Sequence, residues 1–324
     1  MAVLVTGGAG YIGSHFVKLL IQNGIECIVI DNLSRGHVEC LNNSVAFENI
    51  DLLEYESLVS TLRSYEIDSV VHFAAFAYVH ESVNKPQLYY QNNVVGSLNL
   101  LKAIYDVGVR KIIFSSTCSV YGNPRNLPVS EDEPVNPINP YAKTKLIIEQ
   151  MLEDFDAAHG LKFVSLRYFN AAGADFSGEI GESHDPEPHL IPNVLFAALG
   201  KREFVNIYGN DYDTTDGTCV RDYIHVNDLA EAHLKALEYL NNFDKSEIIN
   251  LGTGKGNSVS EVVATAKKIT SGEIITKISG RRAGDPAVLI ADNKKAKQLL
   301  DWSPRFDLEE IIESAWIWHK NQKY

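Results

Sequence analysis

The chain has 324 residues, of which 45% are hydrophobic and 22% charged, and these proportions are typical of a globular protein with one large or two ordinary domains. Its formal net charge of −13 at pH 7 argues against nucleic acid and against an anionic membrane as partners. No apolar run is long enough to cross a membrane, and the chain starts directly with a predicted strand. We therefore expect a cytoplasmic protein without a signal peptide.

Cysteine and histidine spacing gives no sign of a disulfide or a metal site. The four cysteines are scattered and form no CxxC pair, so they are expected to be reduced and to fill apolar space. The ten histidines show no HExxH or similar ligand spacing. We therefore expect no metal.

The first thirty-one residues predict a dinucleotide-binding βαβ unit. An apolar strand over residues 2–5 leads into a turn with Gly7, Gly10 and Gly13, and a helix over residues 11–23 follows. A second apolar strand, 25–30, ends on Asp31. Such a turn brings the backbone close to a pyrophosphate, which the free N–H groups of a helix N-terminus attract.

Asp31 supports this interpretation, because a glycine triplet alone also occurs in ordinary loops. It lies 18 residues after Gly13, at the end of the next strand, where a carboxylate can accept hydrogen bonds from both ribose hydroxyls. The carboxylate would repel a 2′-phosphate, so NAD is predicted rather than NADP. Arg35, a possible partner for a 2′-phosphate, leaves NADP as the alternative.

Strand and helix patterns alternate through the first half, which indicates a Rossmann-type, doubly wound parallel sheet. Further strands are predicted over 45–47, 69–73, 111–115 and 163–167. Helices are predicted over 54–64, 87–107 and 141–158. Ligands bind beyond the carboxyl ends of strands in such sheets, so polar residues that follow the strands are candidate site residues.

The second half is less regular, with long loops over 171–192, 209–218 and 252–257. A helix near 226–239 and a strand near 248–251 could extend the first sheet. The predicted division is therefore an NAD-binding domain over 1–170, to which 221–251 returns. A smaller mixed α/β domain is predicted to comprise 171–220 and 252–324.

Tyr141 and Lys145 form a YxxxK motif, in which both side chains lie on one face of a helix. A nearby ammonium favours phenolate and lowers the pKa of a phenol toward that of a usable base. Tyr–Lys pairs are also common on helix surfaces. The helix-start signal Asn139-Pro140 and the hydroxyl-bearing strand end Ser116-Thr117 favour the catalytic interpretation.

Six motifs resemble the extended short-chain dehydrogenase/reductase superfamily: TGGAGYIGS, DNLS, HFAA, SSTCSVYG, PYAKTK and RYFNAAGA. Two downstream stretches, residues 206–233 and RRAGDPAVLIAD at 281–292, are similar to those of UDP-glucose 4-epimerases. The resemblance covers nearly the whole chain and implies that the smaller domain binds the UDP-sugar.

The resemblance implies a role for each matching residue. Tyr141 would be the catalytic base, Lys145 its supporting cation and Thr117 a helper hydroxyl, all three also close to the cofactor. Further NAD contacts would come from Gly7, Gly10, Tyr11, Ile12, Gly13, Asp31, Asn32, Asp51, Leu52, Phe73, Ala74, Asn93 and Phe169. UDP-sugar contacts would come from Thr117, Asn170, His189, Tyr208, Arg221, Arg282, Asp285 and Leu289.

Arginines suit a diphosphate because their guanidinium groups bind its oxygens in bidentate fashion. For Arg221 and Arg282 the alternative is a structural ion pair, with Asp222 or Asp285 as partner. His189 stands where some relatives have Asn and can still donate one hydrogen bond. Leu289 stands where some have Tyr near the sugar 2-substituent, which leaves room for an N-acetyl group.

The implied reaction is NAD-dependent interconversion of UDP-glucose and UDP-galactose through a transient 4-keto sugar, an isomerase step in galactose metabolism. The alternatives are the N-acetyl or pentose epimer pairs, a nucleotide-sugar dehydratase or decarboxylase, and an NAD-binding sensor protein. Thr117-Cys118-Ser119 lacks the carboxylate that dehydratases place there, which argues against a dehydratase or decarboxylase. Tyr141, Lys145 and Thr117 are all present, which argues against a sensor protein without catalytic activity. Members of the family commonly form homodimers through helices that match 87–107 and 142–158.

Overall fold

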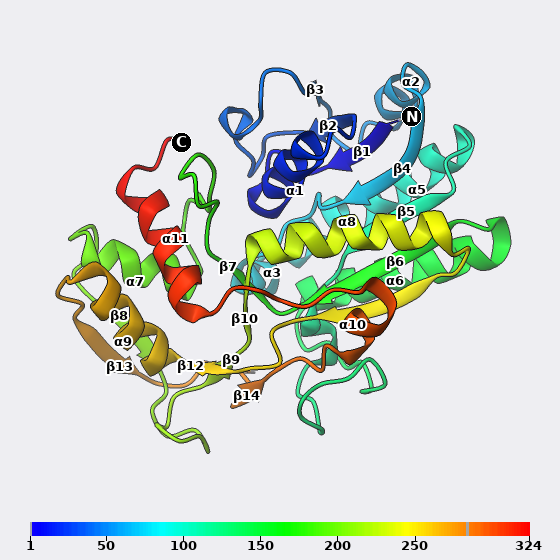
Figure 1. Cartoon of the computed structure of the whole chain (residues 1–324). Helices are drawn as coiled ribbons and strands as arrows, with labels where there is room; N and C mark the ends of the chain where they lie inside the picture. The colour runs from blue at the N-terminus through cyan, green and yellow to red at the C-terminus, as the bar shows by residue number, and fades with distance from the viewer. Residues whose placement is uncertain (1, 283–284) are drawn as a thin grey trace.

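A seven-stranded, all-parallel sheet forms the larger lobe of the computed structural model, which describes residues 2–282 and 285–324 (Figure 1). The strand order is β11-β6-β5-β4-β1-β2-β3, so the chain winds outward in both directions from the neighbouring strands β1 and β4. The strands are β1 Ala2–Thr6, β2 Cys27–Asp31, β3 Ala46–Asn49, β4 Ile67–His72, β5 Lys111–Ser115, β6 Lys162–Tyr168 and β11 Glu247–Leu251. The predicted Rossmann-type fold is confirmed.

Helices cover both faces of this sheet, and each face has its own apolar core. One core lies between the sheet and α1 and α8, with Phe16, Val29 and Leu237 among its buried side chains. The opposite core lies under α2, α5 and α6 and contains Leu58 and Leu100. The helices of this lobe are α1 Tyr11–Gln22, α2 Tyr55–Arg63, α3 Val79–Asn84, α4 Pro86–Tyr89, α5 Gly96–Asp106, α6 Pro140–His159, α8 Val226–Asn242 and α10 Lys294–Leu300. Short helical turns are η1 Val38–Cys40, η2 Tyr90–Val95 and η3 Cys118–Tyr121.

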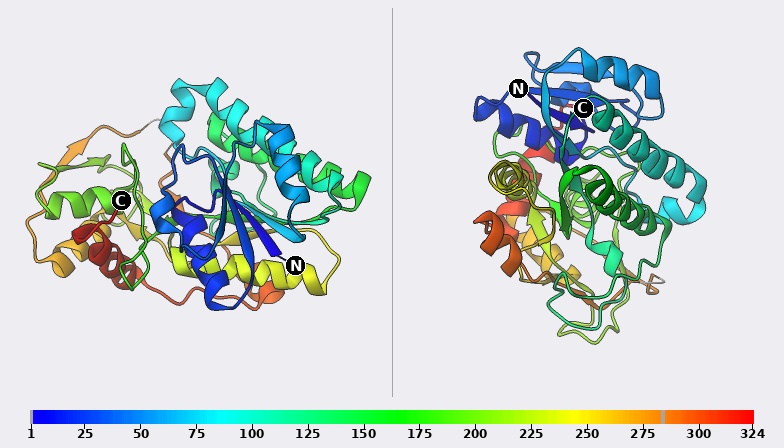
Figure 2. Two further views of the ribbon diagram at one scale, coloured as in Figure 1. Left: turned by 90° about the horizontal axis from the view of Figure 1, so that it is seen from above. Right: turned by 90° about the vertical axis from the view of Figure 1, so that its right-hand side faces the viewer.

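The smaller lobe lies beside the carboxyl-terminal edge of the sheet, as the view from above shows most clearly (Figure 2). Its core packs α7, α9 and α11 together around Val194, Val262 and Ile312. The helices are α7 Leu190–Ala198, α9 Val259–Thr270 and α11 Leu308–Lys320. Its strands are β7 Asn170–Ala172, β8 Val205–Tyr208, β9 Val220–Arg221, β10 Tyr223–His225, β12 Asn257–Ser258, β13 Thr276–Ser279 and β14 Val288–Leu289.

The second half returns to the first sheet as predicted. β11 pairs in parallel with β6, Ile249 opposite Leu166, and α8 packs against α1. The predicted helix over 87–107 is a near-continuous run of α4, the π-helical turn η2 and α5. In the described part of the chain, no helix is both long and apolar enough to cross a membrane.

Candidate active site

The glycine turn is closed too tightly for larger residues at two positions. Gly7 has φ +72°, and a Cβ there would lie 2.5 Å from the backbone nitrogen of Ala74, beyond β4. A Cβ on Gly13 would lie 2.2 Å from the Gly7 carbonyl oxygen, whereas one on Gly10 would lie 3.3 Å from it. The turn therefore presents bare backbone at the N-terminus of α1, and the first turn of this helix carries no acidic side chain to oppose an anion. These residues fit the pyrophosphate of NAD.

Asp31 is buried at the end of β2 and stands next to this turn. Its two carboxylate oxygens accept hydrogen bonds from the backbone N–H groups of Ala9 (3.0 Å) and Leu33 (2.9 Å). Burial raises the pKa of Asp31, and these two hydrogen bonds oppose the rise. Each oxygen keeps a lone pair for a ribose hydroxyl. The predicted neighbours Asn32 and Asp51 are hydrogen-bonded to each other at 2.9 Å.

Arg35, the alternative partner of a 2′-phosphate, is engaged elsewhere. Its guanidinium forms a 2.6 Å ion pair with Glu81 and lies over the ring of Tyr78, 4.5 Å from the centroid. This pairing agrees with NAD rather than NADP.

Asn93 fixes the backbone that follows β4, where Phe73 and Ala74 are predicted cofactor contacts. Its fully buried side-chain amide accepts a hydrogen bond from the N–H of Phe76 at 2.8 Å and donates one to the Phe76 carbonyl at 3.0 Å. The same amide also donates to the Thr144 hydroxyl. Asn93 therefore connects the loop after β4 to α6. Leu52 packs in the core under α5, and Ile12 packs against the opposite core.

Tyr141, Lys145 and Thr117 are brought together by the start of α6 and the end of β5. Asn139 caps α6 by accepting a hydrogen bond from the N–H of Ala142, which sets Tyr141 in the first turn. Tyr141 is 9% exposed, and burial raises the pKa of its phenol well above the usual range. Hydrogen bonding with Thr117 lowers this pKa and so opposes part of the rise. Without a positive group beside it, Tyr141 is a neutral phenol at pH 7.

Lys145 is buried, and its ammonium donates a 2.7 Å hydrogen bond to the Ser115 carbonyl at the end of β5. Burial lowers the pKa of Lys145 to about 7, although the nearby Glu149 carboxylate opposes this change. The sequence predicted that this ammonium lowers the pKa of Tyr141. In the structure it is bonded to the backbone, and the principal influences on the phenol are burial, Tyr168 and Thr117.

A buried polar network beneath these residues was missed by sequence reasoning. Glu149 on α6 forms a 2.6 Å ion pair with Arg167 on β6 and accepts a hydrogen bond from Ser116 at 2.6 Å. Arg167 also donates to the Tyr121 hydroxyl, which donates to Asn250 on β11. Glu149 lies four residues after Lys145, a spacing that places both on one face of α6, but its partner on β6 could be found only from the fold.

Four predicted substrate residues lie in the smaller lobe. Arg221 on β9 donates to the Val220 and Pro286 carbonyls, both at 2.8 Å, and approaches Asp285 at 3.8 Å. Arg282 lies over the ring of Tyr208, 3.9 Å from the centroid. Asp222, the other possible partner of Arg221, instead accepts hydrogen bonds from the backbone of Thr253, Gly254 and Ala291.

Phe169, Asn170 and Leu289 lie where the two lobes join. Phe169 and Leu289 pack with Cys118 and Val120 in one apolar cluster, and Leu289 is 8% exposed. Asn170 pairs with Tyr223 of β10 and donates its N–H to the Asp222 carbonyl.

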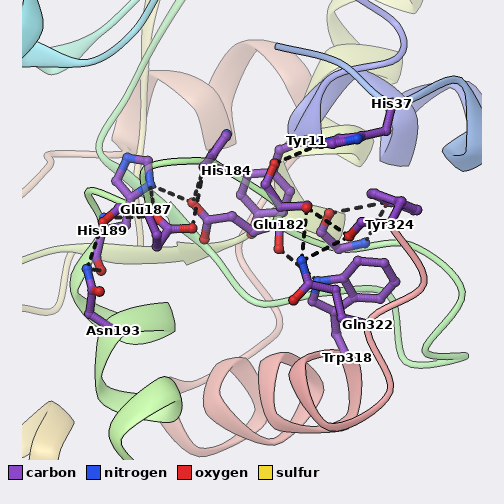
Figure 3. Close-up of polar contacts among 12 residues, drawn as sticks. Tyr11, His37, Glu182, His184, Glu187, His189, Asn193, Trp318, Gln322 and Tyr324 are labelled. Carbon is purple, nitrogen blue, oxygen red and sulfur yellow. Dashed lines mark hydrogen bonds and ion pairs between the residues drawn. The ribbon is translucent and has the colours of Figure 1, made fainter. Parts of the chain in front are cut away.

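Two predicted residues take part in contacts that the sequence did not indicate. Tyr11 donates a 2.6 Å hydrogen bond to the Gly173 carbonyl, beyond β7. His189, at the N-cap of α7, contacts Glu182 and Glu187 (Figure 3). Burial alone would lower the pKa of His189, but these carboxylates raise it to about 10.

The parallel sheet, the glycine turn and the buried Tyr–Lys pair define a dinucleotide-dependent enzyme of the extended short-chain dehydrogenase/reductase class. A family model described as the NAD dependent epimerase/dehydratase family matches residues 3–252. The chain belongs to this family.

Known relatives extend the similarity to the whole chain. A UDP-glucose 4-epimerase of Halalkalibacterium halodurans is 50% identical, covering 100% of this chain and 97% of that protein. The crystal structure of a Brucella ovis UDP-glucose 4-epimerase in complex with NAD is 48% identical, with a TM-score of 0.95 and 97% of both chains covered. A Bifidobacterium longum UDP-glucose 4-epimerase in complex with NAD+ and UDP is 39% identical, with a TM-score of 0.94 and 99% of both chains covered.

Proposed function

We propose that this chain is a UDP-glucose 4-epimerase that interconverts UDP-glucose and UDP-galactose in galactose metabolism. The observation that carries the proposal is the joining of Tyr141, Thr117 and Lys145 at the edge of the sheet that also holds the glycine turn. The full-length similarity to proteins of this activity supports it.

Each member of this set has a distinct task. NAD, when bound, supplies hydride chemistry at C4 of the sugar and a positive charge that favours the phenolate of Tyr141. Tyr141 takes the proton of the 4-hydroxyl and returns it after the 4-keto sugar has turned over. Thr117 stays hydrogen-bonded beside the phenol, and Lys145 connects the site to the end of β5 through Ser115.

We assign the UDP part of the substrate to the smaller lobe. Arg221 and Arg282 supply two cations that match the two negative charges of a diphosphate. The Arg221 guanidinium donates hydrogen bonds to the Val220 and Pro286 carbonyls, and these bonds position it before any ligand binds. Asn170 and Leu289, at the junction of the lobes, would then face the sugar, and His189 would contact the substrate through its ring or backbone.

The N-acetyl pair UDP-GlcNAc and UDP-GalNAc is the second candidate substrate. Leu289 favours it, because a leucine occupies less space near the sugar 2-substituent than the tyrosine of some epimerases. Leu289 also lacks a hydroxyl that would compete for hydrogen bonds with the sugar.

The test is to incubate the purified protein separately with UDP-glucose, UDP-GlcNAc and UDP-xylose, without added NAD, and to separate the products by chromatography. UDP-galactose is expected from UDP-glucose, because the NAD is regenerated in each cycle and needs no replenishment. If none of the three sugars yields its 4-epimer, the proposed function is wrong.

We also propose that the enzyme is a cytoplasmic homodimer. Large apolar side chains are exposed along one stretch of the larger lobe, from α3 to α5. They include Val79, Val83, Tyr90, Val95, Leu98 and Tyr105, which are 37–58% exposed. An exposed apolar patch of this kind suits a two-fold interface, in which the same surface of both subunits would be buried. Light scattering after gel filtration is expected to give twice the chain mass of 36.0 kDa.

A further inference from the structure

The loop between β7 and α7 gathers two carboxylates and two imidazoles, of which only His189 has a part in the proposed function. Glu182, His184, Glu187 and His189 each offer one ligand atom, and these atoms lie within 4.8 Å of one another. In Figure 3 the four side chains point toward a common centre, beside Tyr11 and above α11. The pattern in the sequence is E-x-H-x-x-E-x-H, which is not one of the familiar ligand spacings.

We propose that these four residues form a structural binding site for a divalent metal ion, Zn²⁺ in particular. The Nδ1 atom of His184 lies 3.1 Å from Glu182 Oε1 and 3.6 Å from Glu187 Oε2. The Nδ1 atom of His189 lies 2.5 Å from Glu182 Oε1 and 3.1 Å from Glu187 Oε1. Ligand atoms around a tetrahedral zinc with bonds of about 2.0–2.1 Å stand roughly 3.3 Å apart, within this range.

Ion pairing alone leaves this cluster incompletely satisfied. Glu182 Oε1, His184 Nδ1 and Glu187 Oε2 are buried and lie within ion-pair distance of one another or of His189, but the angles of these contacts do not suit hydrogen bonds. The Glu182 and Glu187 side chains are each only 4% exposed. Such unsatisfied atoms are costly, and a cation at their centre would satisfy all three at once.

The donor set fits zinc chemically. Imidazole nitrogen and carboxylate oxygen are both zinc ligands, and four protein donors fill a tetrahedral site completely. Two carboxylates also neutralise a divalent ion, so the occupied cluster with neutral imidazoles carries no net charge. A closed site of this kind is structural, because no position remains for a substrate or a reactive water.

The surrounding structure holds the loop in place before any metal binds. Trp318 on α11 donates its indole N–H to the Glu182 carbonyl at 2.8 Å, and Gln322 donates to the Ser183 hydroxyl at 2.9 Å. The His184 ring packs edge-on against Tyr11 and Tyr78, with centroids 6.3 and 5.5 Å away. The metal would therefore fasten the loop to the N-terminus of α7, with His184 packed against Tyr11 of α1.

The test uses the full-length protein, freed of metal with a chelator and then titrated with Co²⁺ and, separately, with Zn²⁺. We expect about one ion per chain, the visible absorption of four-coordinate Co²⁺, its displacement by Zn²⁺, and a higher thermal midpoint with Zn²⁺. His184→Gln should weaken binding at least about tenfold, the lower limit seen when even an outer-shell partner is lost. The matched control is His80→Gln, an exposed histidine outside the cluster, which should bind as the unaltered protein does.

Two results would overturn the proposal. One is an unaltered protein that shows no four-coordinate Co²⁺ spectrum and no saturable Zn²⁺ binding, in which case the cluster is an ion-pair network only. The other is a His184→Gln variant that binds both ions as tightly as His80→Gln. If His184→Gln does not fold, the Co²⁺ spectrum of the unaltered protein decides the question. None of these readouts depends on epimerase activity.

Discussion

At the scale of single residues, the site depends on two buried groups with opposed pKa shifts. Burial raises the pKa of the Tyr141 phenol and lowers that of the Lys145 ammonium to about 7. In both cases the low-dielectric surroundings disfavour the charged form. A positive charge brought next to Tyr141 by the cofactor would favour phenolate, so the base would be generated mainly in the loaded enzyme.

Replacing Tyr141 with Phe removes the proposed base while keeping the ring that fills its buried position. We expect the fold and bound NAD to be retained, and kcat to fall roughly a hundredfold to ten-thousandfold, the contribution typical of general acid–base catalysis. The measurement is steady-state turnover of UDP-glucose together with the NAD content of the protein. Tyr55→Phe is the control, because its hydroxyl bonds Asp106 on the surface. Turnover of Tyr141→Phe near that of the control would exclude Tyr141 as the base.

Lys145 should make the stability of the cofactor-free protein depend on pH. Its pKa is about 7 in the folded chain and near 10.5 when exposed, so between these values the unfolded chain binds more protons. The cost of burying the ammonium is therefore full below pH 7 and declines as pH rises toward 10.5, by up to about 1.4 kcal/mol per pH unit. Lys145→Met removes the ammonium and therefore this cost. The gain of the variant in free energy of unfolding, relative to the unaltered protein, should be greatest at pH 6 and smaller at pH 9.

Denaturant unfolding at several pH values measures this effect. Lys143→Met, at an exposed position two residues earlier, should follow the pH profile of the unaltered protein. If the Lys145→Met and Lys143→Met profiles run parallel between pH 7 and 10, Lys145 is not buried as an uncharged amine in that range.

At the scale of elements, much of the site could be predicted because it depends on local signals. The Gly7–Gly13 turn, the end of β2 at Asp31 and the start of α6 at Asn139 are short patterns with one dominant geometry. The strand over 111–115 was predicted with the bounds that the structure has. The contacts of Glu149 with Arg167 and of Asn93 with Phe76 could not be predicted, because each joins residues that only the packed helices bring together.

The glycine turn permits a test at this scale. A Cβ on Gly13 would lie 2.2 Å from the Gly7 carbonyl oxygen, so Gly13→Ala must push the turn open. We expect a loss of about 1–3 kcal/mol in the free energy of unfolding and weaker NAD retention. Gly280→Ala, where a Cβ meets nothing within 4 Å, should change stability by less than about 0.5 kcal/mol. Thermal unfolding and cofactor content measure both, and equal behaviour of the two variants would contradict the steric argument.

At the scale of the whole molecule, the two halves of the chain differ in how far the sequence predicts them. The alternating pattern of the first half is sufficient for a parallel sheet, and the return of residues 247–251 beside β6 was also predicted. The short strands β8, β9, β13 and β14 of the smaller lobe were not, because segments of two to four residues show no periodicity. The Glu182–His189 cluster was missed for the same reason, since a loop rather than a regular element sets its spacing. The proposed division into 1–170 with 221–251, and 171–220 with 252–324, stays a prediction.

The central claim is that the 4-epimer forms by oxidation and reduction at C4, with the same hydrogen returning to the same carbon. The most direct test is to convert UDP-glucose labelled with deuterium at C4, in ordinary water and without added NAD, and to analyse the UDP-galactose by mass spectrometry and NMR. The account predicts that the deuterium remains at C4 of the product, because the hydride does not exchange with solvent while NAD stays bound. Loss of the label to water would contradict transient oxidation and would point to removal of the C4 hydrogen as a proton.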